Sequence, residues 1–163
     1  MSRIGTALKK RSDVVAFYGV EDIYYRMRGF TESSISKNST EYSRQYVDED
    51  GEQTDVTGYS PSISYKFDAY VGNQVHEDLA EIHDGELTGT SAVRTILLVD
   101  MTAAGTSGSA KKAIQREYAV IPDAEGDSTD AYTYSGTFKA KGAKKSIEVT
   151  SSDDFETVTI VTT

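Results

Sequence analysis

SISYKFDAYV, residues 62–71, alternates between polar and apolar side chains at almost every step. Its apolar positions include Ile63, Tyr65, Phe67, Ala69 and Val71, and the positions between them hold mainly serine, lysine and aspartate. Successive side chains of a β-strand point to opposite faces, so this period of two predicts a strand with one buried face. We therefore expect this segment to form one wall of a β-rich core.

Six other segments have strand-like patterns, at residues 23–30, 93–101, 113–121, 131–142, 145–151 and 155–161. The segment 93–101 is apolar almost throughout, which indicates burial on both faces. We expect 131–142 and 145–151 to pair as a hairpin that turns near Gly142. Together these segments predict a mainly β fold, a sandwich or barrel of about seven or eight strands with one α-helix packed outside.

The predicted helix covers residues 74–84. Val75, Leu79 and Ile82 recur at helical spacing and form an apolar stripe that should pack on a sheet. Asn73 is a suitable N-cap, and Gly85 suits the end of the helix.

Length, charge and composition limit the possible functions. The 163 residues suit a single domain spanning 1–163, and the formal net charge of −9 opposes stable binding to nucleic acid. A local basic patch is predicted at Lys139, Lys141, Lys144 and Lys145. There is no cysteine, which excludes thiolate chemistry. Residues 1–19 lack the apolar core of a secretory signal, and no segment approaches the ~18 apolar residues of a membrane span, so we expect no membrane association.

KNSTEYSRQYVDEDGEQTDVTGY, residues 37–59, is polar and charged but contains three tyrosines. We interpret it as a protruding hairpin whose tight turn is at Asp50–Gly51. Tyr42, Arg44 and Tyr46 should share one side of the first limb, and Asp55, Thr57 and Tyr59 should share one side of the second. An isolated two-stranded ribbon is marginally stable in water, so this arm should rest on another copy of the chain. The predicted interface residues are Tyr42, Arg44, Tyr46, Asp48, Asp55 and Tyr59.

No catalytic or metal-binding motif is complete. His76 and His83 do not form the H-E-x-x-H zinc motif, because position 80 is Ala80. With Gly51 as the sixth position of a calcium loop, the first position would be Tyr46 and the twelfth Thr57, so that pattern fails. We expect no enzymatic activity, no metal and no cofactor, and we expect both histidines to lie on a solvated, acidic helix face.

Several stretches together resemble a known family. They are the segment KNSTEYSRQYVDEDGEQTDVTGYSPSISYKFD and the shorter DGEL, AVRTILLVD and YAVIPDAEGDSTDAYTYSGTFKAKG. In their order they resemble the major tail tube proteins of long-tailed phages and prophages of Gram-positive bacteria. The resemblance covers about residues 14–155, and it lies in overall order rather than in a catalytic signature.

The resemblance implies a β-sandwich or barrel with a flanking helix, which assembles into hexameric rings that stack as a hollow tail tube. It implies a virion tail protein, assembled in the host cytoplasm, whose partners are other copies of itself, the tape measure protein, tail tip or baseplate proteins and the tail terminator. Genomic DNA would pass through the lumen without stable binding. Two alternatives stay open: a tube protein of a contractile tail or phage-derived injection system, and a monomeric β-barrel that binds a small ligand.

Overall fold

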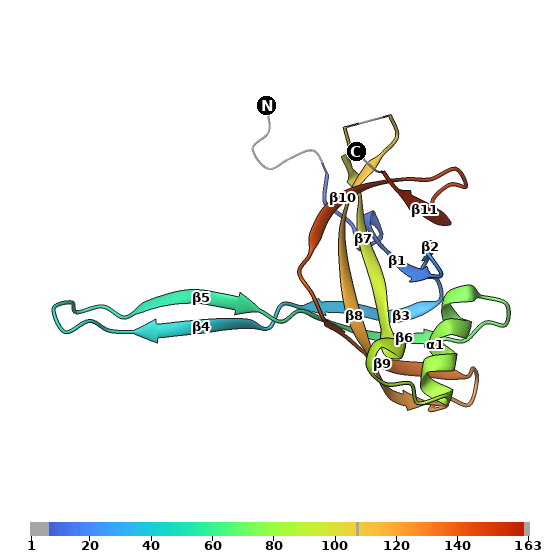
Figure 1. Ribbon diagram of the computed structural model, residues 1–163, viewed down its shortest axis with the longest axis horizontal. Coiled ribbons are helices and arrows are strands. Elements are labelled where there is room, and N and C mark those ends of the chain that lie inside the picture. Colours follow the sequence, from blue (N-terminus) through green and yellow to red (C-terminus); the bar gives the residue numbers. More distant parts are fainter. Residues whose placement is uncertain (1–6, 107, 162–163) are drawn as a thin grey trace.

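The computed structural model describes residues 7–106 and 108–161. The predicted domain, residues 1–163, therefore lies partly outside the described residues. So does the stretch 1–19, where no secretory signal is predicted. Within them, the chain forms a β-rich body from which a two-stranded arm projects (Figure 1). No helix in the described ranges is long and apolar enough to span a bilayer.

The body contains one antiparallel sheet of nine strands, in the order β10-β11-β2-β1-β7-β8-β9-β6-β3. The strands are β1 (Val14–Val20), β2 (Ile23–Arg26), β3 (Phe30–Ser36), β6 (Ser62–Asp68), β7 (Val93–Ala104), β8 (Lys111–Glu125), β9 (Thr133–Ala140), β10 (Lys145–Thr150) and β11 (Thr157–Ile160). Two short 3₁₀ helices, η1 (Arg11–Asp13) and η2 (Gly89–Ala92), precede β1 and β7. The mainly β fold class is confirmed, with more body strands than the seven or eight expected.

Part of this sheet closes on itself. Strand β10 pairs with β11 and also with the first part of β8, which joins six strands into a barrel. Its interior is filled by side chains, namely Val15, Phe17, Leu97, Val99, Ala113, Val149 and Val158. Strands β9, β6 and β3 continue the sheet beyond the barrel.

Strand β8 is long enough to hold two partners along one edge. Its residues 118–125 pair with β9, and its residues 111–115 pair with β10. The predicted hairpin between 131–142 and 145–151 is therefore wrong. Strand β9 stops pairing with β8 at Ala140, and β10 starts pairing with the same edge of β8 at Lys145. The exposed segment between them continues in the same direction, so β9 and β10 do not form a hairpin.

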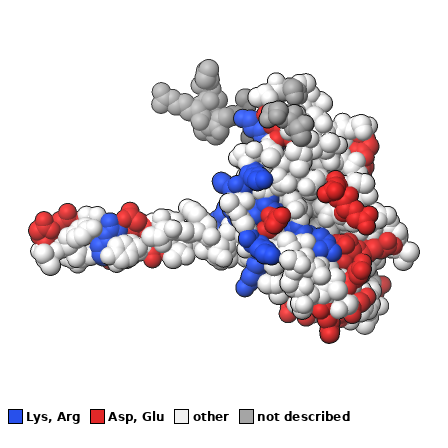
Figure 2. All heavy atoms as spheres, viewed as in Figure 1, with Lys and Arg blue, Asp and Glu red and all other residues white. Residues whose placement is uncertain are grey.

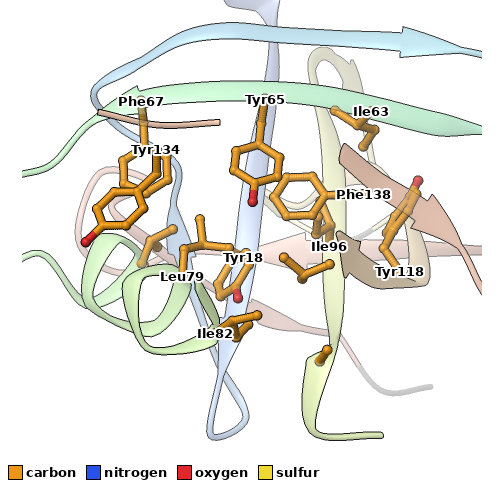
Figure 3. Packing of buried hydrophobic residues seen from close by; sticks show 13 residues of the cluster. Tyr18, Ile63, Tyr65, Phe67, Leu79, Ile82, Ile96, Tyr118, Tyr134 and Phe138 are labelled. Carbon is orange, nitrogen blue, oxygen red and sulfur yellow. The ribbon is translucent and has the colours of Figure 1, made fainter. Parts of the chain in front are cut away.

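The second core lies between the barrel wall, the β9-β6-β3 extension and the helix. Neighbouring residues on one strand serve different cores: Phe17 and Leu97 point into the barrel, whereas Tyr18 and Ile96 point into the second core. The predicted burial of both faces of 93–101 is thus confirmed at Ile96 and Leu97, whereas Leu98 is only half-buried. In Figure 3 the rings of Tyr65 and Phe138 are stacked in this core, with centroids 4.3 Å apart.

Helix α1 (Gln74–Asp84) covers this second core, as predicted. The side chain of Asn73 accepts hydrogen bonds from the backbone N–H groups of Val75 and His76, which caps the helix. Leu79 and Ile82 are fully buried, and Figure 3 shows them directed toward Tyr18.

The alternation in β6 is confirmed as far as Phe67, because Ile63, Tyr65 and Phe67 are all buried. Val71 lies beyond the end of the strand and is fully exposed, so its predicted place on the buried face is wrong.

Candidate functional site

The arm is the most prominent feature outside the body. Among the described residues, strands β4 (Ser39–Arg44) and β5 (Gln53–Tyr59) pair only with each other, and they extend away from the nine-stranded sheet (Figure 1). Nearly all of their residues are exposed. The structure therefore has the protruding hairpin that the sequence predicts over residues 37–59.

The end of the arm is a loop, residues 45–52, rather than a two-residue turn. The backbone N–H of Glu49 donates to the carbonyl of Tyr46 at 3.1 Å, which forms the hydrogen-bonded turn. The Gln45 side chain donates to the carbonyls of Glu49 and Asp50, each at 3.3 Å. The predicted tight turn at Asp50–Gly51 is wrong, because Gln45 holds a wider loop in which those two residues form only a bend.

The register decides which side chains share a face of the arm. Tyr42 lies opposite Asp55, and Tyr59 lies opposite Ser39. A register shift between Thr40 and Glu41 adds one residue to β5, so that Tyr59 lies on the opposite face from Asp55. The predicted common side for Asp55 and Tyr59 is therefore wrong.

Arg44 is the centre of one arm face. Its guanidinium carbon lies 5.1 Å from the ring centre of Tyr42 and 5.5 Å from that of Tyr46, both within cation–π range. Its Nε donates to the Tyr46 hydroxyl at 3.2 Å, and it forms an ion pair with Asp55. The hydrogen bonds to Tyr46 and Asp55 raise the pKa of Arg44. Four of the predicted site residues are thus brought together, while Asp48 lies in the tip loop and Tyr59 near the root.

Apolar side chains on the arm have few partners within the chain. Tyr42, Tyr46, Val56 and Tyr59 are each about half exposed or more, and Val47 in the tip is fully exposed. The predicted interface residues are tyrosines and charged side chains, and they do not include Val47 and Val56. Tyrosine and arginine are typical anchors of protein interfaces, and this arm presents them with apolar neighbours.

The prediction that both histidines lie on a solvated helix face is wrong, since both are buried. The Nδ1 atom of His76 accepts a hydrogen bond from the backbone N–H of Tyr70 at 3.1 Å, and its Nε2 lies 2.6 Å from the carbonyl oxygen of Arg28. This pair of partners fits the neutral ring with the proton on Nε2. The ring also stacks on Phe67, with centroids 4.6 Å apart.

His83 is buried in a similar way. Its Nε2 lies 2.7 Å from the hydroxyl of Tyr65, and its ring packs edge-on against Tyr134. Burial lowers the pKa of both His83 and His76. The histidines therefore tie the inner face of α1 to the sheet instead of facing solvent. Their spacing of seven residues places them on the same side as the apolar stripe, and this was the signal available in the sequence.

The described residues contain no group of three or more histidine and carboxylate side chains placed to hold a metal ion. A groove of about 990 Å³ runs along the outer wall of the barrel and is lined in part by Val14, Leu98 and Ile114. Two of its charged side chains are already paired with each other, Lys9 with Asp100 at 2.6 Å.

No protein-family model and no curated protein matches the sequence. Among solved structures, a chain from the tail of an empty gene transfer agent (GTA) particle with C6 symmetry is similar, with a TM-score of 0.60 and 14% sequence identity. The alignment covers 85% of this chain and 98% of that one. The chain shares the fold of a GTA tail protein. A chain from the virion of the native GTA particle gives a TM-score of 0.58 at 14% identity, with the same coverage.

A chain from the sixfold-symmetrised baseplate of the anti-feeding prophage aligns with a TM-score of 0.49 and 8% identity, over 90% of this chain and 97% of that one. The β-rich fold that the sequence resemblance implied is similar to the fold of the two GTA chains. The narrower link to long-tailed phages of Gram-positive bacteria stays a prediction.

Proposed function

We propose that this chain is a structural subunit of a phage-like tail tube. The observation that carries the proposal is the fold: nearly the whole length of a protein from a C6-symmetric GTA tail aligns with this chain. The exposed arm supports it, because a hairpin with exposed tyrosines and valines gains most of its stabilisation from contacts with another molecule. In this role the chain is not an enzyme, and its interface residues include Tyr42, Arg44, Tyr46, Asp48, Asp55 and Tyr59.

In the proposed assembly, six copies form a ring by head-to-tail contacts, and rings stack into a hollow tube. Contacts of this kind close into a ring when the rotation between copies permits. The partners are neighbouring copies, a tape measure protein inside the tube, and tail tip or baseplate and terminator proteins at its ends. DNA passes through the lumen without stable binding, and the mature location is the tail of a particle assembled in the host cytoplasm. The proposal includes a long, non-contractile tail, with a contractile tail or injection system as the alternative.

The alternative from another class, a monomeric barrel that binds a small ligand, finds less support. The barrel interior is a packed core, with Phe17 and Leu97 fully buried inside it. Small barrels that hold a ligand leave that interior open.

Electron microscopy of the purified chain tests the proposal. Wild-type protein should form rings or tubes, alone or after addition of a tail-tip complex. In a second protein, residues 39–58 are replaced by a short Gly-Ser turn. The root of the arm lies outside the replaced segment, because Asn38 donates to the Ser60 carbonyl at 3.0 Å and the Ser60 N–H donates to the Lys37 carbonyl at 3.2 Å. The shortened chain should therefore fold with an unchanged body.

We expect the shortened chain to be soluble and monomeric, with cooperative unfolding like that of the wild type, and to form no tubes. Ser43→Ala, on the opposite face of the arm from Arg44, serves as the control and should assemble normally. Tubes of normal length from the shortened chain would remove the arm from the assembly interface. A wild-type protein that stays monomeric under all these conditions would contradict the tube function itself.

A further inference from the structure

The tip of the arm carries a cluster of like charges. Its loop contains Asp48, Glu49, Asp50 and Glu52 and no basic residue, a formal charge of −4. All four side chains are exposed, and none forms an ion pair with another described residue. Val47, in the same loop, is a fully exposed apolar side chain.

An opposite charge lies where β9 leads into β10. Lys139, Lys141, Lys144 and Lys145 are exposed, and the segment 139–145 contains no acidic residue, a formal charge of +4. None of these lysines is in an ion pair within the described part of the chain. This basic segment confirms that the four predicted lysines gather in one exposed stretch.

The basic segment lies beside the root of the arm. Lys139 is opposite Ser62 in the sheet, and the N–H of Ala140 donates to the carbonyl of Pro61 at 2.9 Å, just where the arm rejoins the body. Arg116 on β8 lies between the stretches that pair with β9 and β10. Its buried Nε has no hydrogen-bond partner among the described residues. Figure 2 shows basic side chains gathered near the root and acidic side chains at the far end of the arm.

These opposite charges are kept apart within one molecule. Tyr46 is nine positions after Lys37, and at about 3.3 Å per residue in a strand the tip stands roughly 30 Å from the root. Figure 1 shows the two strands of the arm running outward without folding back on the body. The tip and the basic segment can therefore meet only between different copies.

We propose that the acidic tip of one copy docks on the basic segment, Lys139–Lys145, of the next copy. This inference rests on the proposed function and names the surface that receives the arm. The arm then acts as a spacer that fixes the distance between copies. Complementary charge gives such a contact its orientation and its rate of association, while Val47 and Tyr46 supply apolar area beside the ion pairs.

Charge reversal with rescue tests this docking. The tip variant carries Asp48→Lys, Glu49→Lys and Asp50→Lys, and the basic-segment variant carries Lys141→Glu, Lys144→Glu and Lys145→Glu. Each variant alone places like charges at the contact, so its self-association should require about tenfold more protein than the wild type. Mixed in equal amounts, each tip faces an oppositely charged segment on the other variant, and association should return.

Sedimentation velocity at low salt and at about 1 M salt gives the readout, because the Debye length falls from about 10 Å at 0.1 M to about 3 Å at 1 M. Association of the mixture should weaken at high salt. The control, Asp84→Lys with Asp123→Lys and Asp130→Lys, has the same net-charge change as the tip variant at exposed positions in the body. It should self-associate like the wild type.

The outcomes separate this docking from the tube function. If each variant alone associates as the wild type does, or if the mixture stays monomeric, the docking is overturned, whether or not tubes form. If the mixture associates but no protein forms tubes, the docking holds and the tube function fails. A basic segment that instead serves a nucleic acid would leave the mixture monomeric, while the basic-segment variant alone would lose binding to a DNA oligonucleotide.

Discussion

Asp78 joins the helix to two strands of the barrel wall. Its Oδ2 accepts a hydrogen bond from the Tyr18 hydroxyl at 2.6 Å and an ion-paired hydrogen bond from Arg94 Nε at 2.8 Å. Tyr18 is fully buried, and burial raises the pKa of its hydroxyl, which therefore stays a donor at all ordinary pH values. The Asp78 side chain is only 13% exposed, so the ion pair is screened little by solvent.

Asp78→Ala should lower the free energy of unfolding by about 2–4 kcal/mol. Leaving the buried Tyr18 hydroxyl without an acceptor costs about 1–3 kcal/mol, and the lost charged hydrogen bonds to Arg94 add to it. Arg94 keeps part of its environment, because its Nη1 still donates to the carbonyls of Ser91 and Val93. Tyr18→Phe removes the donor but leaves the ion pair intact, so its cost should be about 0.5–1.5 kcal/mol.

Urea unfolding of the two single variants and the double variant gives the coupling energy. In the Tyr18→Phe background there is no orphaned hydroxyl, so Asp78→Ala should cost at least ~1 kcal/mol less than in the wild type. Asp78→Asn, which keeps an acceptor for Tyr18 but loses the charge, should fall between wild type and Asp78→Ala. Additive single-variant costs, within about 0.3 kcal/mol, would refute the idea that Asp78 binds the helix and both strands as one unit.

Three further predictions concern the second core. Leu79→Ala, at a fully buried helix position, should cost about 2–5 kcal/mol in urea unfolding, and an unchanged midpoint would mean that α1 does not pack there. Gly136→Ala should cost about 1–3 kcal/mol or more, because its Cβ would lie 2.4 Å from the Ile121 carbonyl oxygen, whereas Gly51→Ala in open space should be nearly neutral. His76 and His83 have lowered pKa values, so the unfolded state binds more protons than the folded state. The stability that they contribute should be complete above pH ~6.5 and should fall toward pH 5. Thermal melts at several pH values should show a weaker pH dependence of stability for the variant with His76→Asn and His83→Gln.

Local patterns predicted the parts of the fold that are decided locally. The alternation of 62–67 requires one buried face, and the structure places Ile63, Tyr65 and Phe67 there. The stripe of α1, its cap Asn73 and its end at Gly85 each depend on residues within a few positions. The arm was predictable for the opposite reason, since a long alternating segment without enough apolar residues for a core has to lie outside the body.

Contacts between distant segments were not predictable in the same way. Nothing near residues 131–151 indicates that β9 and β10 share one edge of β8, because that pairing depends on the length of β8 and on closure of the barrel. The extra residue in β5 that moves Tyr59 to the other face is a property of the pairing with β4. The buried histidines needed the aromatic pocket of Phe67, Tyr65 and Tyr134, which forms only when β6, β9 and α1 meet.

The position of the two opposite charges limits the symmetries that the arm can support. The basic segment lies beside the root of the arm. Two copies can therefore each place the acidic tip on the basic segment of the other only if their arms run antiparallel, which gives a closed two-fold dimer. A head-to-tail contact instead leaves one free tip and one free basic segment, so every added copy creates a new site and growth continues until a ring or filament results. The proposed tail-tube function requires the second arrangement. The reversed-charge mixture decides between them, since an antiparallel pair stops at the mass of a dimer, whereas head-to-tail docking gives species whose mass increases with concentration.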